Sequence, residues 1–171
     1  MMKVQLQRLQ EFVNQMKATS SLNEKKVIIG TIKNDEFITE ALKYGYDPYK
    51  KYYVTSANCK KRYDLCHEHH GNKDIGNLFN MLDKLDNRVW TGHEAIAHVN
   101  GFVHNYKEYA DLIYSIIDRN LELRASESVI NKVIPGLIPT FDVALANKFD
   151  PKRVNWEHTW FASRKLDGVR C

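Results

Sequence analysis

Lys165, Asp167, Gly168 and Arg170 have types and a spacing that suit covalent chemistry on a nucleotide. A lysine amine attacks phosphorus only when it is unprotonated, so a site that uses Lys165 must lower the pKa of this amine by burial and by neighbouring cations. Gly168 permits a tight turn, Arg170 presents a fork of donors to phosphate or ribose oxygens, and Asp167 would orient the lysine. The alternative interpretation is a solvated β-turn, because Asp-Gly is a common turn pair.

The composition is typical of an intracellular globular protein. The chain has 171 residues, 43% of them hydrophobic and 27% charged, and a formal net charge of +4. This mildly basic balance is compatible with a polyanionic partner. Three cysteines are too few for a disulfide framework. No apolar run is long enough to span a membrane, and the first residues are too polar for a signal peptide, so no membrane association is expected.

The hydrophobic periodicity predicts a mainly α fold over most of the chain. Apolar residues recur at three- and four-residue steps, and serine, threonine or asparagine precedes several of these stripes, as at helix starts. The predicted helices are 4–16, 21–32, 35–44, 74–85, 91–103, 106–121 and 126–134. The polar segment 56–72 is predicted to be a loop, and 141–146 and 159–165 are predicted to be extended strands.

The upstream residues carry a resemblance to a known family. Segment 119–139 reads Arg-Asn-Leu-Glu-Leu-Arg-Ala-Ser-Glu-Ser and then Val-Ile-Asn-Lys-Val-Ile-Pro-Gly-Leu-Ile-Pro. It resembles, without a gap, the end of the N-terminal domain of T-even-phage-type ATP-dependent DNA ligases. Segment 91–96 resembles a helix start of the same family, and the Lys165 motif follows in the family's order. The resemblance covers residues 74–171, whereas the first 70 residues carry no diagnostic motif.

The resemblance implies a helical DNA-binding domain, 1–140, followed by the start of an adenylation domain, 141–171, that is truncated after the lysine motif. It implies nicked double-stranded DNA as partner, ATP and Mg²⁺ as cofactors, a C-terminal ligase half as a further partner, and the host cytoplasm as location if a phage encodes the chain. Lys165 would be the catalytic nucleophile, and Lys165, Asp167, Gly168 and Arg170 would bind ATP. The truncated chain alone is not expected to complete ligation.

The expected DNA contacts lie around the resembling segment. They are Arg119, Arg124, Ser126, Ser128, Asn131 and Lys132. Serine hydroxyls and backbone N–H groups at a helix start suit phosphate, but the same serines could simply cap the helix. The charged side chains could equally form a solvated surface. Two departures stand out: Arg124 replaces a glycine that these ligases commonly have, so the turn before Ser126 could differ, and Ser163 replaces a Glu or Gln that faces adenine.

Other interpretations remain open at this point. A stand-alone DNA-binding module without catalysis would need only the helical domain, and an RNA ligase or capping-type nucleotidyltransferase would share the lysine motif. Cys59, Cys66 and the histidines that follow do not have the spacing of common zinc sites, so no metal site is predicted. The basic run 60–62 is expected to be solvent-exposed, and Tyr49, Tyr52 and Tyr53 are expected to be packing residues rather than a base-stacking platform.

Overall fold

The computed structural model describes residues 1–65, 77–140, 151–153 and 155–159. The chain divides into two units, Met1–Phe141 and Asp142–Cys171. The described elements of the first unit are α1 (Met2–Ala18), α2 (Leu22–Thr31), α3 (Glu36–Tyr46), α4 (Ser56–Lys61), η1 (Tyr63–Leu65), α5 (Leu78–Asp86), α6 (Gly92–Asn105), η2 (Lys107–Tyr109), α7 (Ala110–Ile117) and α8 (Glu127–Val133). The second unit contains the described 3₁₀ turn η3 (Pro151–Arg153).

The described residues confirm a mainly α fold, with helices and no strand among them. The predicted strands 141–146 and 159–165 lie outside the described residues, except for Thr159. One loop prediction and one helix prediction need correction. Segment 56–72 is not wholly a loop, because Thr55 caps α4 by accepting a hydrogen bond from the Asn58 backbone N–H at 3.2 Å. Segment 106–121 is not one helix, because η2 precedes α7 and the helix ends at Ile117.

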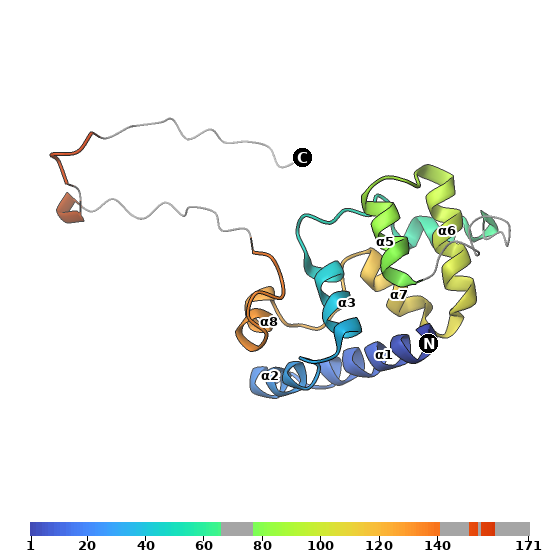
Figure 1. The fold of residues 1–171 in the computed structure, drawn as a ribbon, viewed down its shortest axis with the longest axis horizontal. Helices are drawn as coiled ribbons and strands as arrows, with labels where there is room; N and C mark the ends of the chain where they lie inside the picture. Colours follow the sequence, from blue (N-terminus) through green and yellow to red (C-terminus); the bar gives the residue numbers. More distant parts are fainter. Residues whose placement is uncertain (66–76, 141–150, 154, 160–171) are drawn as a thin grey trace. The chain divides into compact units, whose positions relative to one another are not determined.

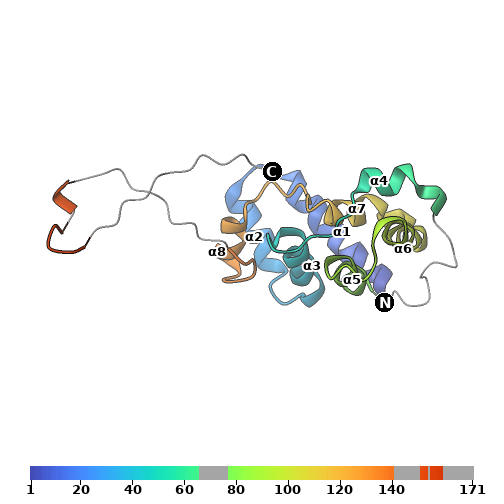
Figure 2. The same ribbon diagram turned by 90° about the horizontal axis from the view of Figure 1, so that it is seen from above.

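Helix α1 packs against α2, α3 and η2. It begins beside α5 and α6, and α2 and α8 lie at its other end (Figure 1; Figure 2). Its apolar residues follow the predicted stripe, and those that are buried are Leu6, Leu9, Phe12, Val13 and Met16. Val4, predicted to join them, is 61% exposed. One amphipathic face of α1 therefore provides a floor on which α2 and α3 pack.

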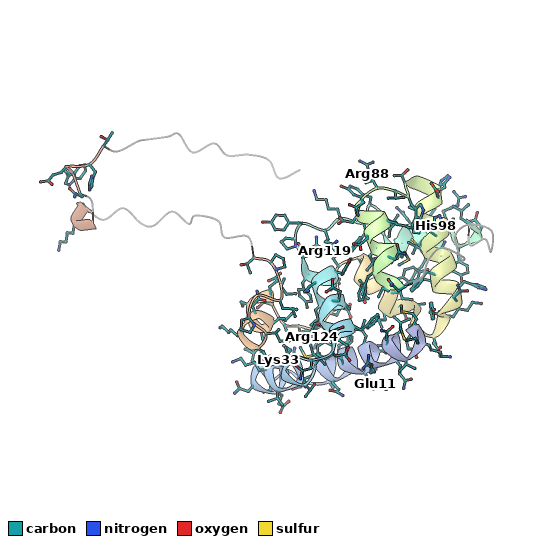
Figure 3. The ribbon with its side chains drawn as sticks, viewed as in Figure 1. Glu11, Lys33, Arg88, His98, Arg119 and Arg124 are labelled. Carbon is teal, nitrogen blue, oxygen red and sulfur yellow. The ribbon has the colours of Figure 1, made fainter. Side chains whose placement is uncertain are left out.

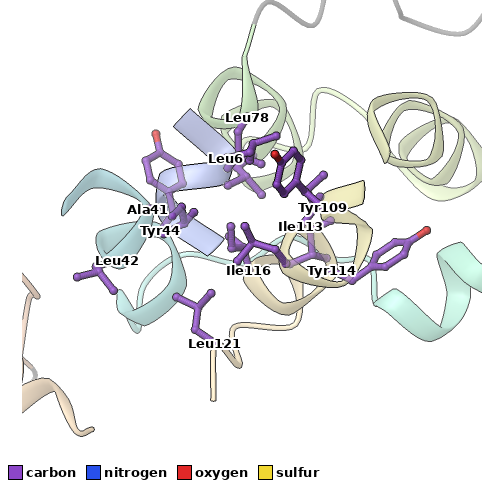
Figure 4. Packing of buried hydrophobic residues seen from close by; sticks show 14 of the residues in the cluster. Leu6, Ala41, Leu42, Tyr44, Leu78, Tyr109, Ile113, Tyr114, Ile116 and Leu121 are labelled. Carbon is purple, nitrogen blue, oxygen red and sulfur yellow. The ribbon is translucent and has the colours of Figure 1, made fainter. Parts of the chain in front are cut away.

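The core lies where α1, α3, α5 and α7 meet. Figure 4 shows Leu6 of α1, Leu78 of α5 and Ile113 of α7 close together, and all three side chains are fully buried. Leu121, which follows α7, also packs into the core at 2% exposure. The core thus holds the non-helical segment 118–126 through Leu121 and Leu123, and this segment carries three of the six predicted DNA contacts.

Candidate nucleic-acid interface

Segment 118–126 joins α7 to α8 by an unusual backbone. Arg119, Glu122 and Arg124 have φ angles of 55°, 52° and 50°, in the left-handed region that side chains other than glycine rarely adopt. Arg124 stands where the resembling ligases have glycine. Its φ lies in the region that favours glycine, so an arginine here occupies a backbone conformation that glycine adopts without steric cost.

A buried lysine, Lys25, binds the backbone of this strained segment through hydrogen bonds. Lys25, on α2, is 1% exposed, and its Nζ donates to the backbone carbonyls of Leu123 at 2.9 Å and Arg124 at 2.8 Å. A buried ammonium needs hydrogen-bonding partners, and these two carbonyls provide them. The sequence contained one signal for this role: Lys25 lies four residues before Ile29, which is fully buried on the same helix.

Two further side chains attach the same segment to α3. The hydroxyl of Tyr46 donates to the carbonyl of Ala125 at 3.2 Å. Burial, followed by the nearby charge of Glu127, raises the pKa of Tyr46 to about 12, so the phenol remains a donor over the whole neutral range. The guanidinium of Arg119 donates to the carbonyls of Lys50 at 3.1 Å and Tyr46 at 3.4 Å. Strained backbone persists where its surroundings over-determine it, as these contacts do here.

The predicted DNA contacts separate into two groups. Arg119 and Asn131 make hydrogen bonds to protein backbone. Nη1 and Nη2 of Arg119 donate to the carbonyls given above, and the amide of Asn131 donates to the carbonyl of Ile138 at 2.8 Å and accepts from its N–H at 2.9 Å. The exposed group, called here the α8 surface, consists of Arg124, Ser126, Ser128 and Lys132. These two hydroxyl groups and two cationic groups are exposed, so they are accessible to a ligand.

The serine hydroxyls of the α8 surface do not cap the helix. Ser126 is the N-cap residue of α8, but its side chain makes no capping hydrogen bond; its Oγ lies 2.9 Å from Oγ of Ser128. Arg124 also lines a cavity of about 450 Å³ together with Lys17, Asn120 and Glu122. Figure 3 shows Arg124, which belongs to the strained segment, above α1. Two hydroxyls and a nearby guanidinium suit the oxygens of a phosphate.

The remaining sequence predictions have mixed outcomes. Lys165, Asp167, Gly168, Arg170 and Ser163 lie outside the described residues. The described part of the chain contains no group of three metal-ligating side chains. Cys59 is a buried free thiol whose pKa burial raises to about 12. Among the helices that the structure describes, none has the length and apolar character needed to span a membrane.

The tyrosine prediction was wrong for two of its three residues. Tyr52 is a packing residue, 3% exposed, with its hydroxyl on the carbonyl of Tyr44 at 2.6 Å. Tyr49 and Tyr53 are instead 62% and 61% exposed. They lie in the loop 47–55. Over 51–55 exposed and buried residues alternate, and the left-handed φ of Tyr53, 56°, accompanies its outward position.

Comparison with known proteins confirms the resemblance. No protein-family model matches the chain. The chain is 28% identical over 165 residues to the DNA ligase of Enterobacteria phage T4 and, to the same extent, to the DNA ligase of Enterobacteria phage T6. The match covers 94% of this chain but 33% of each ligase. The chain is therefore similar to these two phage DNA ligases and spans about a third of their length.

Proposed function

We propose that this chain forms the DNA-binding part of an ATP-dependent DNA ligase and carries the lysine that becomes adenylated. The similarity to two phage ligases supports the reaction. The observation that carries the DNA-binding role is the α8 surface, whose donors project from a backbone that Lys25 and Tyr46 hold from within. Pre-ordered donors bind a phosphate without a further cost of ordering.

The proposed reaction has three steps. The amine of Lys165 attacks the α-phosphate of ATP, a phosphorus–nitrogen bond forms, and pyrophosphate leaves. The 5′-phosphate at the nick then takes the adenylate from the lysine. Finally the 3′-hydroxyl attacks this activated phosphate, the strand is joined, and AMP leaves. Magnesium would neutralise the phosphates; we assign it no protein ligand, because no metal-ligating group gathers among the residues described.

In this proposal the α8 surface positions the duplex rather than doing chemistry. Arg124 and Lys132 supply charge, and Ser126 and Ser128 supply neutral donors that fit around a phosphate. Contacts to phosphates fix register without reading bases, which suits an enzyme that must join nicks in any sequence. The proposal therefore predicts affinity that falls steeply with salt.

Two measurements test the proposal. Fluorescence anisotropy with nicked duplex, intact duplex and single-stranded RNA, each over a salt series, should give duplex binding that weakens as salt rises, with preference for the nick. Intact-protein mass spectrometry after incubation with ATP and Mg²⁺ should give a mass gain of one adenylate that Lys165→Ala abolishes. Duplex binding without the adduct would favour a DNA-binding module without catalysis. Tight RNA binding would favour an RNA ligase or capping-type enzyme.

A further inference from the structure

A second strained and exposed site lies away from the α8 surface. Of the five non-glycine residues with positive φ in the described part of the chain, three belong to segment 118–126, and the other two are Tyr53 and Arg88. Tyr53 lies in the loop between α3 and α4, and Arg88 in the loop between α5 and α6. Figure 3 shows Arg88 and Arg124 well apart on the first unit.

These two loops meet and form one surface. The guanidinium carbon of Arg88 lies 4.9 Å from the centre of the Tyr53 ring. Below this pair, the backbone N–H of Lys51 donates to Oδ1 of Asp86 at 2.8 Å, and Nζ of Lys50 lies 3.3 Å from Oδ2 of the same carboxylate. The contact between the two loops is therefore built into the fold and does not depend on the exposed side chains alone.

Left-handed backbone in both loops directs large side chains outward. Tyr53 is 61% exposed, whereas its neighbours Tyr52 and Val54 are buried. Arg88 is also exposed, and Trp90, two residues later, is buried. A positive φ costs about 1 to 2 kcal/mol at a residue with a side chain. Strain of this kind collects at sites where side chains meet a ligand.

The two carboxylates near this surface, Asp83 and Asp86, both pair with Lys50. The oxygens of Asp86 accept from Lys50 and Lys51, as described above, and Oδ1 of Asp83 accepts from the Tyr44 hydroxyl at 2.7 Å and from Lys50 at 3.1 Å. Both carboxylates thus share the ammonium group of Lys50 and accept further hydrogen bonds from neutral donors. The side chains of Lys51 and Arg88 make no ion pair with any carboxylate among the described residues.

Lys84 adds a third cation at the same place. Its Nζ lies 4.6 Å from the centre of the Trp90 ring, and it makes no ion pair in the described part of the chain. The three cations Lys51, Lys84 and Arg88, together with the exposed Tyr53, form what we call the Tyr53 surface. Lysine and arginine interleaved with exposed aromatic rings are typical of surfaces that bind nucleic-acid backbone.

We propose that the Tyr53 surface is a second contact with the phosphodiester backbone of a nucleic acid, separate from the α8 surface. Arg88 and Lys51 would take the place of phosphate counterions, and Tyr53 would offer its ring to a sugar or base and its hydroxyl to a phosphate. The inference rests on the proposed function, since it extends the footprint of the same DNA on the protein. Two contacts on separate parts of one unit would hold a duplex more rigidly than one.

The test uses the salt dependence of binding by the full chain. Each phosphate contact contributes about 0.9 to the slope of log K against log salt on duplex DNA. Arg88→Gln and Lys51→Gln should each weaken duplex binding about threefold or more at low salt and lower the slope by roughly this amount. Lys107→Gln, an exposed cation on η2 outside both surfaces, is the matched control and should leave the slope unchanged.

The variants separate this inference from the proposed function. An unchanged slope for Arg88→Gln and Lys51→Gln, while Arg124→Ala lowers the slope, would overturn the Tyr53 surface and leave the proposed function standing. No duplex binding by the unaltered chain would sink both. Circular dichroism of each variant is the control for folding. A loss on Tyr53→Leu that is confined to single-stranded DNA would overturn the duplex contact, because it would assign the surface to unstacked bases.

Discussion

Replacing Arg124 by glycine should make the protein more stable and make it bind DNA less well. Arg124 has a φ of 50°, a conformation that glycine adopts without steric cost. If the arginine is retained because its side chain contacts phosphate, then the protein tolerates backbone strain for the sake of binding. Stability and affinity should therefore move in opposite directions at this one position.

The size of the stability effect follows from two opposing terms. Relief of the left-handed strain favours Arg124→Gly by about 1 to 2 kcal/mol. The greater freedom of glycine in the unfolded chain offsets about 0.5 to 1 kcal/mol of this. The net gain should be about 0.5 to 1 kcal/mol, or a rise in melting temperature of a few degrees for a unit of this size. Arg124→Ala keeps the strain and should gain nothing.

The two variants should behave alike in binding. Both remove the guanidinium, so both should weaken duplex affinity about fivefold to tenfold at low salt, equivalent to about 1 to 1.4 kcal/mol, and both should lower the salt slope by about 0.9. Stability is measured by urea unfolding and binding by fluorescence anisotropy. A glycine variant no more stable than the alanine variant would refute the strain argument. An unchanged slope in both would refute the phosphate contact.

Three further predictions concern groups buried beneath or beside the proposed surfaces. Lys25→Met should lower the unfolding free energy by about 1 to 3 kcal/mol in a urea titration, because two carbonyls lose their charged donor. Lys26 is exposed, so the control variant Lys26→Met should have little effect in the same titration. The pKa of Tyr46 is raised from 10.0 to about 12, so the stability that its neutral phenol contributes is complete below pH 10 and is lost as pH rises towards 12; Tyr46→Phe should therefore show a smaller fall in melting temperature over that range, and an equal fall would contradict this assignment. Burial raises the pKa of Cys59 to about 12. In a variant with the other cysteines replaced by serine, the Cys59 thiol should therefore react with a disulfide reagent at neutral pH only as fast as the protein unfolds. Rapid reaction of the folded protein would show that the thiol is accessible.

Local sequence patterns predicted the helices well where one face is apolar. The stripe from Leu6 to Met16 predicted α1, and that from Leu78 to Leu85 predicted α5, because a three- and four-residue spacing is a property of neighbouring residues alone. The same method failed at α4, which is short and polar. It also extended the helix of α7 to Leu121, since that leucine continues the apolar pattern although the helix ends at Ile117.

The sequence by itself therefore determined the mainly helical class, most helix positions and the relationship to phage DNA ligases, because periodicity and motif order are written along the chain. Only the tertiary structure decided which candidate contacts are available. Nη1 and Nη2 of Arg119 and the amide of Asn131 are bonded to backbone groups, while Arg124 is exposed to solvent. The reason is that their partners come from distant places: Lys25 reaches carbonyls 98 and 99 residues away, and no local pattern specifies such a contact. The same holds for Tyr53 and Arg88, which meet only because α3 and α5 pack together.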